Sequence, residues 1–271
     1  MRRMVANMRI AALLLSAALL PLVGGHGAAQ EVDVDLELVL AVDVSRSMDP
    51  AEQELQKDGY LAALQHPEVI AAIRSGFLGR IAVTYVEWAG PSSQTIVAPW
   101  AIIDGLESAS ALADSIAVRP VSYLHGTSIS GALNFTAGLF DRNGFRSTRQ
   151  VIDISGDGPN NMGYPVLAAR EAVLERGITI NGLPIMLSLE YFGGYSIREL
   201  DLYYEDCVIG GPGAFLITVE SIDRIAEAIR RKLVLEIAGR PAMIVPAQLG
   251  ATAPRIDCMI GEKLRRRWID P

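Results

Sequence analysis

Cysteine and histidine are scarce in this chain, which has two cysteines and three histidines among 271 residues. Cys207 and Cys258 have no histidine near them, and their spacing matches no zinc motif. These absences disfavour a zinc centre built on thiolates. Two alternatives remain for the cysteines: one disulfide, which an oxidising compartment would allow, or two buried free thiols.

Basic residues and long apolar runs are also few. Lysine and arginine number 24 against 31 acids, and the net charge of −7 disfavours a nucleic-acid partner, whose phosphates would be repelled. The apolar run at residues 10–23 follows three arginines and is short for a bilayer span. It predicts a signal peptide over residues 1–29, with a periplasmic or secreted product. An uncleaved membrane anchor is the alternative; no later apolar stretch approaches spanning length.

The rest of the chain alternates short apolar runs with longer amphipathic ones. This pattern predicts an α/β fold: a three-layer, doubly wound, mostly parallel sheet with helices on both faces and one short antiparallel edge strand. We expect one domain over residues 30–239 and a C-terminal tail, residues 240–271, packed on it or tethered to it. Strands are expected at 36–42, 80–89, 95–99, 150–155, 179–185 and 214–219. Helices are expected at 50–64, 67–74, 106–116, 128–140, 165–176, 197–205 and 221–237.

Oxygen-bearing side chains follow the first predicted strand, in the stretch LELVLAVDVSRSMDP. Asp43, Ser45 and Ser47 are spaced two apart, so an extended backbone places them on roughly one side. One carboxylate and two hydroxyls form an oxygen-only set that suits Mg²⁺ or Mn²⁺. The alternative is a polar turn that caps the next helix.

Two later segments contain similar residues at corresponding places. HGTSISGAL puts Thr127 in a turn before a helix, where helix N-capping is the alternative role. DISGDGPNN puts Asp157 just beyond another strand, where an ordinary turn residue is the alternative. In parallel sheets, ligands bind beyond the carboxyl ends of the strands. All three segments are therefore expected at one edge of the sheet.

In this order, the three segments resemble the metal-ion-dependent adhesion site of the von Willebrand factor A-type (vWA) domain. The resemblance covers about residues 35–238, and VIDISGDGPNN and CVIGGPGAF look more specifically like a bacterial exported branch of unknown function. It implies that Ser45, Ser47 and Thr127 contact a metal directly, and that Asp43 and Asp157 hold it, usually through water. The implied metal is Mg²⁺, with Mn²⁺ or Ca²⁺ as alternatives. A partner protein's Asp or Glu would complete the coordination.

One departure from the family pattern concerns the third segment. The family often has Thr-Asp-Gly or a similar ending on this strand, whereas here the acid follows Gly156. Asp153 therefore competes with Asp157 as the third-segment acid, and we expect it behind the ligands. His125, Asn160 and Asn161 are further candidates for positions behind the ligands or at the rim.

These residues favour an exported, divalent-cation-dependent protein-binding module. The alternatives are a metal-assisted hydrolase at the same site and a purely structural domain. We predict no enzyme, because the sequence offers no second metal cluster, no nucleophile elbow and no histidine well placed as a general base. The glycine-rich segment 210–215 lacks the lysine and hydroxyl of a phosphate-binding loop.

Overall fold

The computed structural model describes residues 31–187, 196–239 and 255–269, all within the unit Glu31–Pro271. The predicted signal peptide and the first half of the expected tail lie outside these residues. The main sheet has five strands in the order β4-β3-β2-β6-β7. They are β2 (Glu37–Asp43), β3 (Ile81–Trp88), β4 (Gln94–Ile103), β6 (Gln150–Gly156) and β7 (Thr179–Pro184). Two short strands, β1 (Val32–Asp33) and β5 (Phe145–Arg146), pair separately.

All neighbours in the main sheet are parallel except β3 and β4. The predicted fold class is therefore confirmed, with β4 as the antiparallel edge strand. At ten residues, β4 is longer than the strand expected at 95–99, and its pairing with β3 is irregular near Tyr85.

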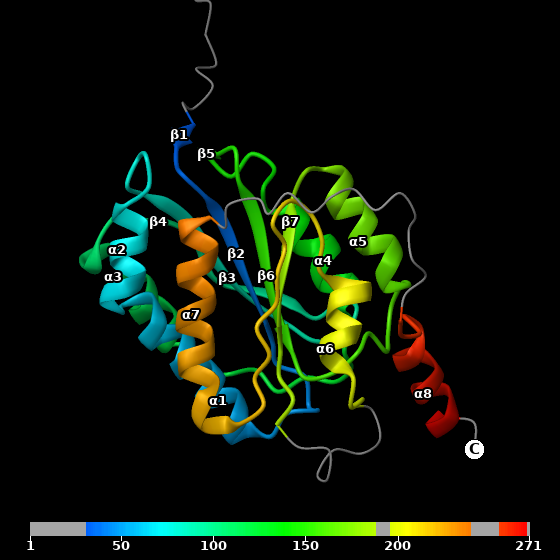
Figure 1. The fold of residues 1–271 in the computed structure, drawn as a ribbon. Coiled ribbons are helices and arrows are strands. Elements are labelled where there is room, and N and C mark those ends of the chain that lie inside the picture. Colours follow the sequence, from blue (N-terminus) through cyan, green and yellow to red (C-terminus); the bar gives the residue numbers. More distant parts are fainter. Residues whose placement is uncertain (1–30, 188–195, 240–254, 270–271) are drawn as a thin grey trace, which may run out of the picture. The chain divides into compact units, whose positions relative to one another are not determined.

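Alternating side chains on the strands divide the core into two layers of helices, one on each face of the sheet (Figure 1). The first layer contains α1 (Pro50–Leu64), α2 (Pro67–Arg74), α3 (Leu106–Ala117) and α7 (Ile225–Ala238). The second contains α4 (Ile129–Gly138), α5 (Val166–Glu175) and α6 (Leu200–Tyr203), which continues as a π-helical turn at Tyr204–Val208.

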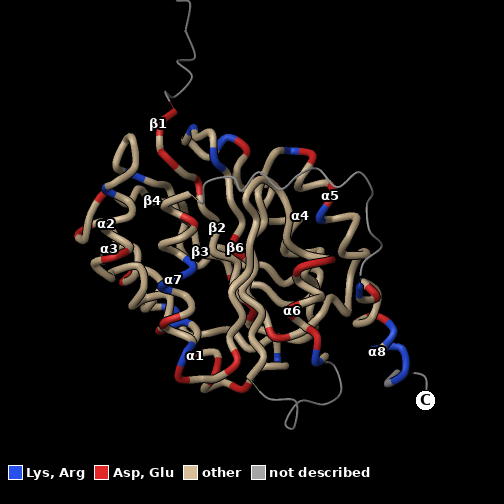
Figure 2. Tube along the Cα trace, in the orientation of Figure 1, with Lys and Arg blue, Asp and Glu red and all other residues tan. Residues whose placement is uncertain are grey.

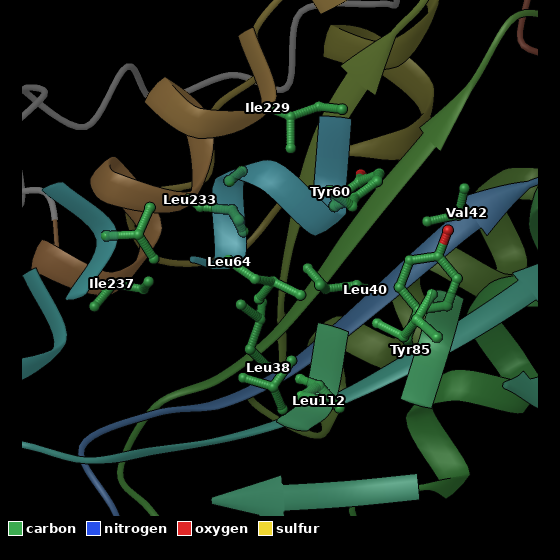
Figure 3. Close-up of a cluster of buried hydrophobic side chains, with 14 of the residues drawn as sticks. Leu38, Leu40, Val42, Tyr60, Leu64, Tyr85, Leu112, Ile229, Leu233 and Ile237 are labelled. Carbon is green, nitrogen blue, oxygen red and sulfur yellow. The ribbon is translucent and has the colours of Figure 1, made fainter. Parts of the chain in front are cut away.

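Strand β2 shows how the sequence produces this division. Leu38, Leu40 and Val42 join the cluster formed with the first layer (Figure 3). Val39 and Ala41 join the cluster formed with the second layer. Every residue of β2 is buried, as its nearly continuous apolar sequence predicts for a central parallel strand. The strand therefore has polar side chains only at its two ends, Glu37 at the start and Asp43 at the carboxyl end.

Other elements also differ from the sequence expectations. The strand expected at 214–219 forms only isolated bridges, from Leu216 to Gly182 in β7 and from Val219 to Ile185 just after β7. The neighbouring β7 residue Pro184 has no N–H to donate, which limits a continuous ladder there. The helix expected at 221–237 begins with a 3₁₀ turn at Ile222–Arg224. A helix that was not expected, α8 (Ile260–Ile269), lies in the C-terminal segment.

Membrane-spanning length is not reached by any apolar helix in the described parts of the chain.

Candidate functional site

The carboxyl ends of β2 and β6 lie side by side where the order of the strands reverses. From β2 the chain continues to β3 on one side, while β6 pairs with β2 on the other. Asp43 is the last residue of β2, and Asp157 follows the last residue of β6. The structure thus brings together two acids that are far apart in sequence, at the place where doubly wound sheets bind ligands.

A chain of hydrogen bonds connects these two acids through the serines. The Ser45 backbone N–H donates to Asp43 Oδ1 at 2.7 Å, and the Ser45 and Ser47 hydroxyl oxygens lie 2.6 Å apart. Ser47 Oγ then donates to Asp157 Oδ1 at 2.6 Å. Four of the five predicted ligand residues therefore form one contiguous cluster of oxygen atoms.

Helix capping does not account for these residues. The side chain of Asp49 caps α1 by accepting from Ala51 N and Glu52 N, with a reciprocal bond from the Glu52 side chain. Ser128 caps α4 by accepting from Gly131 N. Since other residues fill both cap positions, the capping alternatives are wrong for Asp43 and for Thr127.

Thr127, the fifth predicted ligand, is placed by the loop that follows β6. Asn161 Oδ1 accepts from Thr127 N at 3.0 Å, and Asn161 N donates to Thr127 O at 2.9 Å. On its other side, the Thr127 loop joins the Ser45 loop, because Leu124 N donates to Val44 O and Arg46 N donates to Leu124 O. The three loops predicted from sequence therefore meet.

Burial makes both acids of the cluster unusual. Asp43 is fully buried, and its pKa is raised well above the usual value, mainly by desolvation and then by the charge of Asp157. Burial also raises the pKa of Asp157 to about 7, although the hydrogen bond from Ser47 lowers it. In the part of the chain that the structure describes, no lysine, arginine or histidine forms an ion pair with either acid.

The residues present fit a hard divalent cation. Asp43 Oδ2 and Tyr204 Oη are buried and have no hydrogen-bond partner among the described residues. A Cβ atom added at Gly156 would lie 2.9 Å from each of these oxygens. An oxygen-only set of carboxylates and hydroxyls is the donor type that Mg²⁺ and Mn²⁺ prefer. The described residues contain no cluster of three or more histidines, cysteines or acids that would suit a different metal centre.

Asp153 lies with another group of side chains. It occupies the middle of β6, where its Oδ1 is 2.5 Å from Nζ of Lys232 on α7. Lys232 also pairs with Glu236, and all three side chains are buried. Asp153 alternates with Ile152 and Ile154, which pack against the second layer of helices. It therefore faces the first layer, where α7 provides the countercharge.

The three remaining candidates take different places. His125 is exposed and its Nε2 lies 2.6 Å from Nη1 of Arg46. Asn161 is half-buried and positions Thr127, as described above. Asn160 is fully buried, behind the site rather than at its rim, and its Oδ1 accepts from Ser130 N at 3.0 Å.

Sequence reasoning missed two residues that lie beside the candidate site. Gln53 Nε2 donates to Ser45 O at 2.7 Å from the buried face of α1. In the sequence, Gln53 is only one of several polar residues in this helix, which is a weak signal of a role beside the site. Tyr204, whose hydroxyl lies beside Gly156, gives no sequence signal, because its nearness to β6 depends on tertiary packing.

Comparison with known proteins places the chain in a family. A family described as "Protein of unknown function (DUF1194)" matches residues 33–241. No curated protein matches the sequence.

Among solved structures, proximal thread matrix protein 1 from the mussel byssus is 14% identical with a TM-score of 0.56. The match covers 78% of this chain and 50% of the mussel protein, and another of its structures is described as having a zinc-occupied MIDAS motif. The pilus adhesin SpaC from Lactobacillus rhamnosus GG is 12% identical, with a TM-score of 0.54 and coverage of 77% and 31%.

A von Willebrand factor type A structure from Catenulispora acidiphila is 14% identical, with a TM-score of 0.52 and coverage of 75% and 43%. The chain thus spans half the length of the mussel protein and less than half of the other two. At these identities the likeness shows the fold alone, which is vWA-like.

Proposed function

Since this chain belongs to the DUF1194 family, whose description assigns no function, we propose from its site that it is an exported, divalent-cation-dependent protein-binding module. The metal would be Mg²⁺, with Mn²⁺ or Ca²⁺ as alternatives. Ser45, Ser47 and Thr127 would be direct ligands, and Asp43 and Asp157 would hold the ion through water.

The observation that carries this proposal is the buried, unpartnered carboxylate oxygen of Asp43. A buried charge without a countercharge is costly, and such groups persist where they are paired or coordinate a metal. Asp43 is joined by hydrogen bonds through Ser45 and Ser47 to Asp157, whose pKa is also raised by burial. A cation among these oxygens would stabilise both acids in their charged forms.

The same ligand set supports a carboxylate as the partner group. A divalent cation with mostly neutral direct ligands retains positive charge that an incoming Asp or Glu neutralises. Arg46, between the two serines, is exposed, lies 5.1 Å from the Tyr123 ring centroid and contacts His125. Its positive charge at the rim favours an acidic partner over a basic one.

An enzyme is less well supported by the same geometry. His125 lies two residues before Thr127, and its Nε2 is engaged by Arg46. General-base catalysis would need that nitrogen free to accept a substrate proton. Among the described contacts, Ser45 and Ser47 have hydroxyl and carboxylate partners but no histidine partner.

A capture experiment tests the proposal. The immobilised protein is exposed to an exported-protein fraction with Mg²⁺ or with a chelator, beside Asp43→Ala and Arg46→Ala. We expect Mg²⁺-dependent retention of a partner by the wild type, none by Asp43→Ala, and weaker retention by Arg46→Ala with unchanged Mg²⁺ affinity. Retention that is independent of both Mg²⁺ and Asp43 would contradict the proposal.

A further inference from the structure

The C-terminal segment 255–269 is anchored to the second helical layer by covalent and ionic contacts. Cys258 forms a disulfide with Cys207 in the π-helical turn, with an S–S distance of 2.00 Å. Arg255 pairs with Asp206 at 2.8 Å and with Glu205 at 2.7 Å. The segment therefore returns to the domain at a fixed point, although it lies beyond the part that matches the family.

From this anchor, the segment contacts the loop that follows β6. The Tyr203 hydroxyl donates to Cys258 O at 3.4 Å and accepts from Asn160 N at 3.2 Å. Asn160 Nδ2 donates to Oε1 of Glu262, in the first turn of α8, at 2.7 Å. Gly261 lies so close to this loop that a Cβ there would be 2.2 Å from Asn160 O. The first turn of α8 thus packs directly on Asn160.

Asn160 in turn connects the segment to two loops of the candidate metal site. It lies three residues after Asp157, and its Oδ1 accepts from Ser130 N on the segment that follows Thr127. The next residue, Asn161, bonds the backbone of Thr127 in both directions. A buried amide whose donor and acceptor ends bind different segments holds those segments at a fixed separation.

We propose that the segment 255–269 is a clasp that holds the Asp157 and Thr127 loops in their metal-binding arrangement, and that the Cys207–Cys258 disulfide keeps the clasp closed. This inference rests on the proposed function and adds regulation to it: the site is complete in the oxidised protein and loosened in the reduced one. Glu262 and Asn160 are positioning residues, since they act through the loop.

The redox step is an exchange with a dithiol. The S–S bond between Cys207 and Cys258 breaks as the dithiol supplies two electrons and two protons, which leaves two protein thiols. The dithiol closes into its own disulfide. After reduction, only non-covalent contacts hold the segment against the second helical layer, among them the exposed ion pairs of Arg255, which are individually weak.

The first test measures Mg²⁺ affinity by calorimetric titration of the full chain. Loss of groups that orient metal ligands typically weakens affinity about 10- to 100-fold. We expect about a 10-fold loss for Glu262→Ala, for the Cys207→Ser/Cys258→Ser double variant and for wild type in dithiothreitol. Glu262→Gln should remain near wild type, because its amide oxygen still accepts from Asn160. Arg266→Ala, on the exposed basic part of α8 (Figure 2), is the matched control.

The second test measures hydrogen–deuterium exchange of residues 157–162 without metal, so it does not depend on the proposed function. The clasp predicts faster exchange in Glu262→Ala and in the double serine variant, and wild-type exchange in Glu262→Gln and Arg266→Ala. Unchanged exchange in Glu262→Ala would overturn the clasp. Faster exchange with no Mg²⁺ binding by the wild type would retain the clasp and overturn the metal-binding function. Faster exchange together with a Mg²⁺ affinity within twofold of wild type would overturn the proposal that the clasp regulates metal binding.

Discussion

Two buried acids, Glu236 and Asp43, show at the residue scale how differently this protein treats buried charge. Glu236 shares the cation Lys232 with Asp153, and Asn181 Nδ2 donates to its Oε1 at 3.1 Å. Asp43 has a backbone N–H bond to one oxygen and no described partner for the other. The charge near Glu236 is balanced by Lys232 within the fold. The unpartnered oxygen of Asp43 instead suits a cation bound from solution.

Replacing Lys232 by alanine should destabilise the protein strongly. It would leave Asp153 and Glu236 buried without their shared cation, and breaking a buried pair in this way costs about 3–5 kcal/mol. Urea denaturation monitored by circular dichroism would measure the change. Arg230→Ala, which removes the more exposed pair with Glu68, is the control and should cost about 0–1 kcal/mol. Equal losses in the two variants would refute this view of the network.

The acid Glu236 should also make stability depend on pH. Burial, followed by the charge of Asp153, raises the pKa of Glu236 to about 8 from the usual 4.5. Because the folded-state pKa is the higher one, its favourable contribution is complete below about pH 4.5 and is lost as pH rises through about 8. The free energy of unfolding of wild type, relative to Glu236→Gln, should therefore fall between pH 5 and pH 8. A constant difference would contradict the shifted pKa.

At the scale of elements, two adjacent residues at the start of α4 have different roles: Ser128 caps the helix, and Thr127 is a candidate site residue. Ser128→Ala removes the side chain that caps α4 and should lower the free energy of unfolding by about 1 kcal/mol. It should leave stabilisation by Mg²⁺ intact. Thr127→Val keeps the cap and should lose most of that stabilisation. Thermal unfolding with and without Mg²⁺ distinguishes the two; full stabilisation of Thr127→Val would remove Thr127 from the ligand set.

Elements whose signal is local could be predicted from the sequence. The apolar run that ends at Asp43 identifies β2, because a buried central parallel strand favours continuous apolar side chains. The β-branched residues before the glycine-rich turn identify β6. The segment 214–219 looks equally strand-like, yet it forms isolated bridges, because regular pairing depends on its neighbour β7. Helix α8 was not among the expected helices, because its sequence is strongly basic and has few apolar residues.

The candidate site shows the same division between local and tertiary information. Motif spacing identified the three loops, and the structure brings them together through contacts such as Ser47 to Asp157. The contacts of Tyr204 beside Gly156 and of Glu262 with Asn160 join distant segments. No local pattern contains such information, so these supporting residues could not be predicted from one sequence.

At the scale of the whole molecule, the sheet order places the candidate site at one edge. The order reverses between β2 and β6, and the loops after these strands meet at that edge. Two layers of helices bury the faces of the sheet. Asp43 Oδ2, which is buried and has no partner among the described residues, lies at this edge, where a bound ion could satisfy it.

The proposed function requires that this edge of the sheet bind one divalent cation and that Asp43 help to hold it. Calorimetric titration of the protein with Mg²⁺ at pH 7.5, beside Asp43→Ala, tests it most directly. The account predicts one Mg²⁺ per chain for the wild type and a rise in folding stability of about 2.7 kcal/mol at 100 times the dissociation constant. Asp43→Ala should show neither effect. A wild type that takes up no Mg²⁺, Mn²⁺ or Ca²⁺, or an Asp43→Ala variant that binds as the wild type does, would contradict the account.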